Sequence, residues 1–194
     1  MPADIVGDPR TQGRGVTEES RVISCRVESA DPLVCGEMVS CTFVIHIRQA
    51  IASPGCVRLW FTPSPYYREP PTYGLPAKGW VFFTRVQFQT DNPQGAGYLT
   101  ALTISGRPAH VRVEPGRCFF DVVCPEGLLP DDTLTVVIGD RSAGGPGAEV
   151  AHHPTLGDWP LLCEVDRTGE GHFVRQTDVP TLRVTSASPA QLWL

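Results

Sequence analysis

The segment LTVVIGDRSAGGPG, residues 134–147, places an acid and a base, Asp140 and Arg141, in a glycine-rich loop directly after an apolar run. A loop of this composition is typical of phosphate sites, where backbone N–H groups at a helix N-terminus hold the anion. Two nucleotide-binding patterns are comparable with this loop, the Walker loop and the dinucleotide-binding G-x-G-x-x-G loop. The Walker loop needs Gly-Lys-Ser/Thr, which is absent, and both loops need a following helix, whereas Pro146 leads into no helical pattern. We therefore predict a structural loop in which Asp140 accepts hydrogen bonds from backbone amides and Arg141 pairs with a carboxylate. Ligand binding by this loop is the alternative.

A second loop, DRTGEG at residues 166–171, has oxygen-bearing side chains at alternate positions, Asp166, Thr168 and Glu170. This spacing is typical of an acidic calcium loop. Calcium prefers about six to eight oxygen ligands, and two acids supply too few. We therefore predict a glycine-bearing β-hairpin here instead of a metal site.

The adjacent histidines His152 and His153 lie near Glu149 and Asp158 in the sequence. Neighbouring side chains of an extended chain point to opposite sides, so these two histidines are poorly placed to bind one ion. No G-x-S-x-G nucleophile elbow occurs in the sequence. We expect no catalytic residue, no metal and no cofactor, with a free-standing metalloenzyme built on these histidines as an alternative.

The cysteines number seven, which is odd, and no two of them have C-x-x-C spacing. Zinc sites need paired ligands at short loop spacing, and disulfide frameworks belong mainly to exported proteins. We expect free cysteines that pack as small apolar residues. They are Cys25, Cys35, Cys41, Cys56, Cys118, Cys124 and Cys163.

The segment Thr62–Gly79 combines five prolines with three tyrosines. Proline has no backbone donor and biases the preceding residue to extended conformations, so we predict a long loop. A loop of this length usually binds something or covers part of the fold. Its aromatic side chains either cover one end of the sandwich or form a surface for a sugar or a protein. We interpret the apolar chain end 192–194 as a partner surface. The residues expected to form a ligand or partner surface are Tyr66, Tyr67, Tyr73, Trp80, Asp140, Arg141 and Trp193.

Alternation of apolar and polar residues predicts the elements that position these groups. Between Val39 and Ile47 the odd-numbered residues are apolar, whereas Ser40, Thr42 and His46 are polar, which indicates a strand with one buried face.

Two hairpins are also predicted. The first joins Ala109–Glu114 to Arg117–Val123, and the second joins Trp159–Val165 to Gly171–Val174.

The composition favours many short strands, because 19 glycines and 19 prolines interrupt the chain of 194 residues and no window has helical periodicity. We predict an all-β fold, an antiparallel two-sheet sandwich of immunoglobulin-like architecture with a long Pro/Tyr-rich loop. We expect a single domain over residues 21–194, preceded by a flexible or edge-strand arm at residues 1–20.

The net charge of −5 argues against nucleic acid as a partner, since binding to phosphates needs a cationic face. No window reaches the roughly 18 apolar residues that a membrane span requires. The polar first residues do not resemble a signal peptide. We therefore expect a cytoplasmic protein without a nucleic-acid or membrane partner.

Several sequence blocks also suggest a family. They are Gly36-Glu37 before a long strand, Pro130–Gly147, Glu164–Val174, Pro180–Val184 and Pro189-Ala190. In order and spacing, these blocks resemble the N-terminal part of a bacterial protein family of unknown function, over roughly residues 30–194. In that family an N-terminal β-sandwich precedes a metal-dependent hydrolase-like domain of the PHP (polymerase and histidinol phosphatase) type.

The resemblance implies a β-sandwich whose catalytic partner is a PHP-type domain. The His-x-His metal motif of that domain has no counterpart here, and the sequence stops at Leu194, where the domain would begin. Our first hypothesis is therefore a non-catalytic accessory or interaction module that pairs with a PHP-type domain or protein. The alternative from another class is a small-ligand binder, for instance for carbohydrate, that uses Trp80 and the Pro/Tyr loop.

Overall fold

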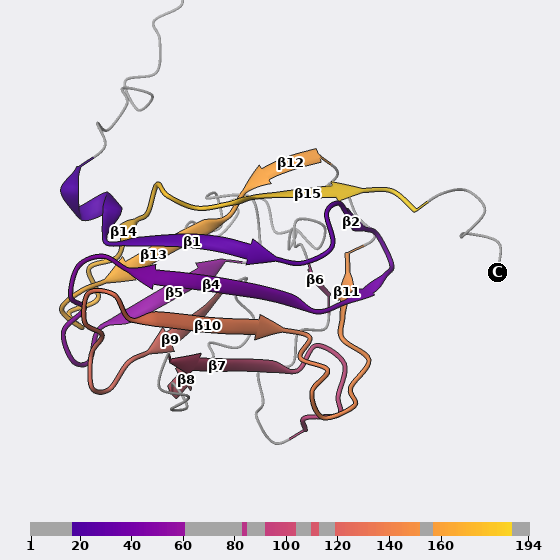
Figure 1. Ribbon diagram of the computed structural model, residues 1–194, viewed down its shortest axis with the longest axis horizontal. Helices are drawn as coiled ribbons and strands as arrows, with labels where there is room; N and C mark the ends of the chain where they lie inside the picture. Colours follow the sequence, from indigo (N-terminus) through magenta and orange to yellow (C-terminus); the bar gives the residue numbers. More distant parts are fainter. Residues whose placement is uncertain are drawn as a thin grey trace, which may run out of the picture.

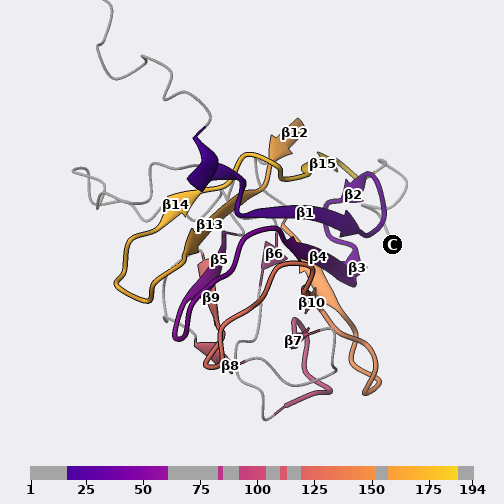
Figure 2. The same cartoon turned by 60° about the vertical axis from the view of Figure 1, so that its left-hand side comes forward.

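The computed structural model describes residues 17–60, 83–84, 92–103, 110–112, 119–151 and 157–187. The described chain forms short β-strands and one turn of 3₁₀ helix, η2 (Glu18–Arg21). Two larger sheets lie face to face, the four-stranded one in front and the five-stranded one behind in Figure 1. Figure 2, turned by 60°, separates the two layers. The predicted all-β sandwich is thereby confirmed.

The strands fall into four hydrogen-bonded sheets. In spatial order, the four-stranded sheet contains β1 (Ile23–Glu28), β4 (Cys41–Ile47), β10 (Thr133–Ile138) and β7 (Leu99–Thr103). The five-stranded sheet contains β14 (Val174–Arg175), β13 (Leu162–Asp166), β5 (Cys56–Trp60), β9 (Phe119–Val123) and β8 (His110–Arg112). One small sheet contains β3 (Met38–Val39), β11 (Ala148–Val150) and β6 (Phe83–Thr84). The other small sheet contains β12 (Gly157–Pro160), β15 (Thr181–Thr185) and β2 (Leu33–Val34).

The four-stranded sheet follows the alternation expected from the sequence. In β4 the side chains of Phe43, Ile45 and Ile47 are buried, whereas His46 is exposed. Phe43 lies in register with Val27 of β1 and Val136 of β10, so neighbouring strands present apolar residues to the same side. This buried side is the inner face of the sandwich, and the opposite side is the outer face.

The three central strands of the five-stranded sheet, β13, β5 and β9, are buried on both faces. Val57 and Leu59 of β5 join the main core that also contains Phe43 of the facing sheet. Trp60 and Phe119, on the outer face of the same sheet, are also buried, at 7% and 2% exposure. These strands therefore lack the clear apolar–polar alternation of β4.

Both predicted hairpins pair as expected, because β8 is antiparallel to β9 and β13 is antiparallel to β14. The predicted single strand Trp159–Val165 is wrong. It is divided into β12 and β13, which belong to different sheets. The division falls where Pro160 supplies no N–H for a ladder and Leu161 donates its N–H to the carbonyl of Pro180. The fold is also not wholly antiparallel, since β15 runs parallel to β2.

A buried glutamine joins the beginning of the described chain to its later part. The Gln176 side chain is 1% exposed, and its Oε1 accepts hydrogen bonds from the N–H groups of Val22 at 2.9 Å and Ile23 at 3.3 Å. Its Nε2 donates to the carbonyls of Glu19 at 3.1 Å and Val174 at 2.9 Å. One side chain thus ties η2 and β1 to β14.

The predicted Pro/Tyr loop and most of the predicted N-terminal arm lie outside the described residues. Within the described residues, no helix has the length and apolar character that crossing a membrane requires.

Candidate functional site

The glycine-rich loop after β10 is held together by Asp140. Its carboxylate accepts hydrogen bonds from the Ser142 N–H at 2.8 Å and from the Thr100 hydroxyl at 2.9 Å. Burial opposes ionisation of this group, but the hydrogen bonds outweigh burial and lower the pKa of Asp140 below its usual value. The predicted hydrogen bonding of Asp140 to the loop backbone is confirmed at the Ser142 N–H.

Among the described residues, Arg141 pairs with no carboxylate and binds backbone carbonyls, which differs from the prediction. Its Nε donates to the carbonyl of Pro146 at 3.1 Å, and its Nη2 donates to the carbonyl of Met38. The guanidinium instead satisfies backbone acceptors at the point where the loop returns to the sheet. With both charged groups bound internally, the structural interpretation of this loop fits the geometry.

Two glycines of the loop differ in their surroundings. Gly139 has a φ of +70°, and a Cβ at this position would lie 2.5 Å from the Val39 oxygen and closer still to the Ala148 nitrogen. Gly144 also has a positive φ, +86°, but no atom lies within 4 Å of the position that a Cβ would occupy. Close backbone packing therefore demands glycine at position 139, whereas position 144 demands only the left-handed conformation.

The DRTGEG segment forms the predicted hairpin loop around Asp166, which is 2% exposed. The carboxylate accepts hydrogen bonds from the N–H groups of Thr168 at 3.1 Å, Gly169 at 2.9 Å and Gly171 at 2.7 Å. Burial works against the charge, yet these hydrogen bonds prevail and lower the pKa of Asp166. The acid thus stabilises the turn between β13 and β14.

The predicted histidine candidates for metal binding, His152 and His153, lie outside the described residues. Within the described part of the chain, no three His, Cys, Asp or Glu side chains gather closely enough to hold a metal ion.

Six of the seven cysteines are described, and all six are free and buried, as predicted. Burial raises the pKa of the Cys124 thiol to about 11 and that of the Cys25 and Cys41 thiols to about 12. These thiols remain protonated at neutral pH and are poor nucleophiles.

The predicted aromatic surface falls on parts of the chain that the structure does not describe. Tyr66, Tyr67, Tyr73, Trp80 and Trp193 all lie outside the described residues. The carbohydrate hypothesis that depends on them stays a prediction.

The outer face of the five-stranded sheet contains an ion pair that sequence reasoning missed. Arg58 of β5 and Asp121 of β9 are directly opposite, with Nε–Oδ1 at 2.7 Å and Nη2–Oδ2 at 2.9 Å. The Arg58 guanidinium lies between two rings, 4.0 Å from the centroid of Phe119 and 3.7 Å from that of Phe173. Burial disfavours its charge, but the hydrogen bonds and charge of Asp121, together with the nearby charge of Glu164, outweigh burial and raise the pKa of Arg58.

A second polar contact lies beside this pair. Trp60 Nε1 donates to Glu164 Oε2 at 3.0 Å, and the Trp60 ring lies 4.7 Å from that of Phe119. The two charged residues of the pair, Arg58 in CVRLW and Asp121 in FFDVV, each stand in the middle of an apolar strand. A single charge in such a position needs a partner of opposite sign, so this signal would have shown that each residue requires a partner, but not which one.

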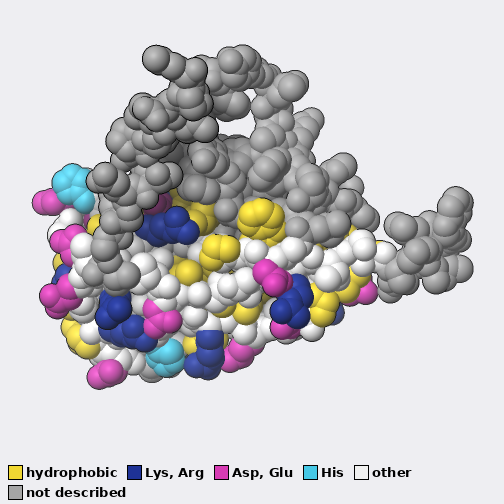
Figure 3. All heavy atoms as spheres, turned by 90° about the horizontal axis from the view of Figure 1, so that it is seen from above, with side chains coloured by type: hydrophobic (Ala, Val, Ile, Leu, Met, Phe, Trp, Pro, Cys, Tyr) yellow, Lys and Arg dark blue, Asp and Glu magenta, His cyan; other side chains and the backbone are white. Residues whose placement is uncertain are grey.

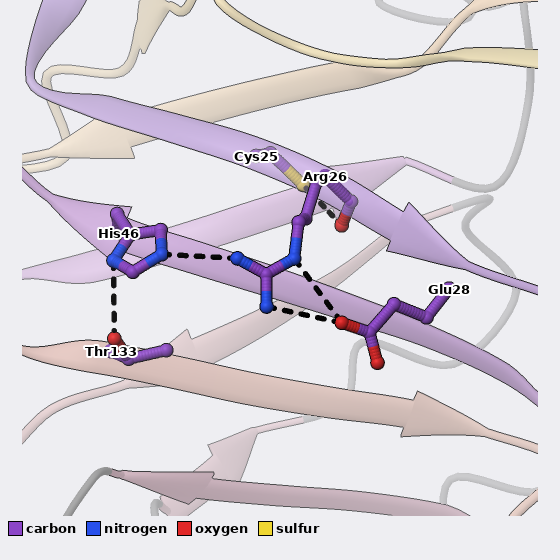
Figure 4. A network of polar contacts seen from close by, with 5 residues as sticks. All are labelled: Cys25, Arg26, Glu28, His46 and Thr133. Atoms are coloured by element: carbon purple, nitrogen blue, oxygen red, sulfur yellow. Dashed lines mark hydrogen bonds and ion pairs between the residues drawn. The ribbon is translucent and has the colours of Figure 1, made fainter.

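The outer face of the four-stranded sheet is open to solvent and has a polar network at its β1–β4 side (Figure 4). Arg26 donates to Glu28 Oε1 through Nε at 3.2 Å and Nη2 at 3.1 Å, and its Nη1 lies 3.3 Å from His46 Nε2. Because arginine only donates, His46 Nε2 accepts, and Nδ1 carries the proton directed at Thr133 Oγ1, 3.2 Å away.

The centre of this outer face consists of β-branched residues. They alternate with core residues along β4, β10 and β7, and their side chains are half-buried, except for Val44, which is buried at 7%. Such side chains have few rotamers, so they lose little conformational entropy when a binding partner orders them. We call this surface the open sheet face; its members are Thr42, Val44, Thr100, Thr133, Thr135 and Val137.

A hollow of about 660 Å³ lies at one end of the sandwich, between η2, residues 50–52 and the β13–β14 hairpin. We call it the end hollow. Ala50, Ala52, Val165 and Val174 supply its apolar lining.

Figure 3 shows that charged side chains of both signs are interspersed over the described part of the surface seen there.

Comparisons with known proteins place the chain in no family. No family model matches it, and no curated protein matches it. Among solved structures, it is similar to a cohesin module from a family 33 glycoside hydrolase of Clostridium perfringens, with a TM-score of 0.39 and 10% sequence identity. The alignment covers 86% of this chain and 98% of that module. A similarity of this size bears on neither ligand nor partner.

Proposed function

We propose that this chain is a non-catalytic interaction module that contacts a protein partner through the open sheet face. The observation that carries the proposal is the contrast in exposure between the two sheets. The central strands of the five-stranded sheet are buried on both faces, whereas the open sheet face presents half-buried threonine and valine side chains together with Arg26 and His46. A flat, stiff surface with an ordered arginine suits protein recognition, where arginine is enriched.

The polar residues that could have suggested catalysis have other roles in this fold. Asp140 and Asp166 accept backbone hydrogen bonds within their loops, and Asp121 binds Arg58. Each carboxylate is thereby engaged in holding a loop or a sheet together. These structural roles of the acids support the proposal that the chain acts as a scaffold for a binding surface.

The partner that we propose is a PHP-type hydrolase domain or protein. The support is the sequence resemblance over Gly36-Glu37, Pro130–Gly147 and Glu164–Val174 to a family in which such a domain follows the β-sandwich. The open sheet face would then lie against that domain. Binding would position the module on the catalytic domain without contributing a reactive group.

The proposal is tested by co-purification and light scattering with a PHP-type protein, using two matched variants. Thr135→Arg places a long cation at the centre of the open sheet face, and Thr181→Arg makes the same change at an exposed position of β15 in a small sheet. We expect a stable complex with the wild type and with Thr181→Arg, and loss of the complex with Thr135→Arg. Equal binding by the two variants contradicts the proposed surface, and absence of any complex with the wild type contradicts the proposed partner.

A further inference from the structure

The end hollow combines an apolar lining with two carboxylates that no described lysine or arginine neutralises. Glu19 reaches it from η2, and Glu170 reaches it from the β13–β14 loop. Among the described residues, no lysine or arginine lies within ion-pair distance of either carboxylate; Glu170 contacts only the Thr168 hydroxyl at 3.4 Å and His172 Nδ1 at 3.8 Å. Two negative charges thus lie beside the same apolar surface.

The arginine that lines the hollow is bound to neutral acceptors of residues 49 and 50. Arg167 Nε donates to the carbonyl of Ala50 at 3.2 Å, and Nη1 donates to Gln49 Oε1 at 3.1 Å. The Arg167 carbonyl also accepts the N–H of Ala52 at 2.8 Å. These neutral acceptors fix the guanidinium against residues 49–52. The two carboxylates outnumber the one guanidinium among the acidic and arginine side chains that line the hollow.

We propose that the end hollow binds a lysine side chain presented by a protein partner. The methylene stem of lysine would pack on Ala50, Ala52 and Val174, and its ammonium would lie between Glu19 and Glu170, since lysine commonly buries its stem and keeps its charge at a polar rim. Lysine fits better than arginine because the two carboxylates come from separate elements. A compact ammonium with three donors can bind both, whereas a guanidinium prefers one carboxylate in a planar, bidentate geometry.

This inference rests on the proposed interaction role, because the lysine belongs to a second polypeptide, but it concerns a different surface from the open sheet face. It can therefore be tested without any partner protein. The probe is Nα-acetyl-lysine N-methylamide, and its control is the norleucine analogue, which keeps the stem and lacks the ammonium. Binding is followed by NMR through the signals of Ala50, Ala52 and Val174 in the folded chain.

We expect the lysine probe to shift these signals and the norleucine analogue to bind more weakly. Glu19→Gln and Glu170→Gln should each weaken the lysine probe about two- to fivefold, in the range for one exposed charge pair. Glu18→Gln, one residue away on η2 and outside the hollow, should leave the affinity unchanged. Raising the salt concentration should weaken binding, because exposed charges are screened.

Four results would overturn the proposal. The first is equal binding of the norleucine analogue, and the second is binding of the lysine probe that is unaffected by either glutamine variant. The third is absence of any shift with the lysine probe. The fourth is a larger shift with Nα-acetyl-glutamate N-methylamide, which would assign the hollow to an anion at Arg167. Because the glutamine changes are at exposed positions, an unaltered spectrum elsewhere verifies that each variant is folded. None of these results depends on whether a PHP-type protein binds the open sheet face.

Discussion

The outer faces of the two sheets each carry an arginine–carboxylate pair, and the two pairs have opposite environments. Arg58 and Asp121 have side chains that are 13% and 0% exposed, and two phenylalanine rings enclose the guanidinium. Arg26 and Glu28 have side chains that are 59% and 57% exposed. In the first pair, little water reaches either charge, so protein groups must compensate both. In the second pair, water can replace either partner.

Because their exposure differs, the two arginine–carboxylate pairs have different roles. A buried pair with matched geometry fixes how β5 and β9 align, because loss of one partner leaves an uncompensated charge. An exposed pair adds little to stability, and its arginine is available to a partner. We therefore expect the five-stranded sheet to determine stability and the four-stranded sheet to provide the binding surface.

The largest effect is expected from breaking the buried pair. Asp121→Ala removes both hydrogen bonds that join the Arg58 guanidinium to this carboxylate, and should lower the free energy of unfolding by about 3–5 kcal/mol. Urea unfolding measures the change. A loss of about 1 kcal/mol or less, the range of an exposed pair, would contradict the importance of burial for this ion pair.

A smaller effect is expected at the end of the same sheet, from Asp166→Asn. The amide cannot accept all the backbone hydrogen bonds that the carboxylate accepts, so the free energy of unfolding in the same urea titration should fall by about 1–3 kcal/mol. Glu170→Gln is the control in the same loop, since its carboxylate accepts only one long hydrogen bond.

The same variant has a predicted pH dependence. The pKa of Asp166 is lowered in the folded state, so its contribution is fully present above the unfolded value of about 3.9 and is lost as the pH falls through the folded-state pKa. Thermal unfolding between neutral pH and pH 2 should therefore show a smaller acid-induced loss in Asp166→Asn than in the wild type. Parallel curves for the two proteins would show that Asp166 is not the group responsible.

The smallest effect is expected in the polar network of Arg26, Glu28 and His46 on the outer face of the four-stranded sheet. Arg26→Ala removes the contacts to Glu28 and His46, and should change the free energy of unfolding by about 1 kcal/mol or less, because all three side chains are exposed. Urea unfolding is again the measurement. A loss comparable to that of Asp121→Ala would remove the distinction between the two sheets.

The local pattern of the sequence predicted the parts of the fold in which one face is buried and the other exposed. In β4, Phe43 and Ile45 alternate with Thr42 and His46, and the strand covers Cys41–Ile47 of the predicted range. Val39, at the start of that range, instead belongs to β3 of a small sheet. The hairpin around Asp166 was equally readable, because a short acidic side chain followed by glycines favours a turn in which the acid accepts backbone hydrogen bonds.

Pairings between distant segments could not be predicted in this way. Arg58 and Asp121 are 63 residues apart, and only the sheet order brings β5 beside β9. Arg141 was expected to pair with a carboxylate, but its acceptors are backbone carbonyls, including that of Met38, 103 residues away. A sequence identifies which side chains require partners, whereas the topology decides which atoms become those partners.

The Gln176 side chain has a consequence for the order in which the molecule is assembled. Its amide satisfies the N–H of Val22, which lies 154 residues earlier in the chain. During synthesis, β1 can meet β4 soon after both have left the ribosome, but Val22 and Ile23 wait for Gln176 before their N–H groups are satisfied as they are in the finished fold. Contacts of such long sequence separation make folding slow. The sandwich is therefore completed only after translation has passed residue 176. In a shorter nascent chain, the start of β1 lacks the hydrogen bonds that Gln176 accepts.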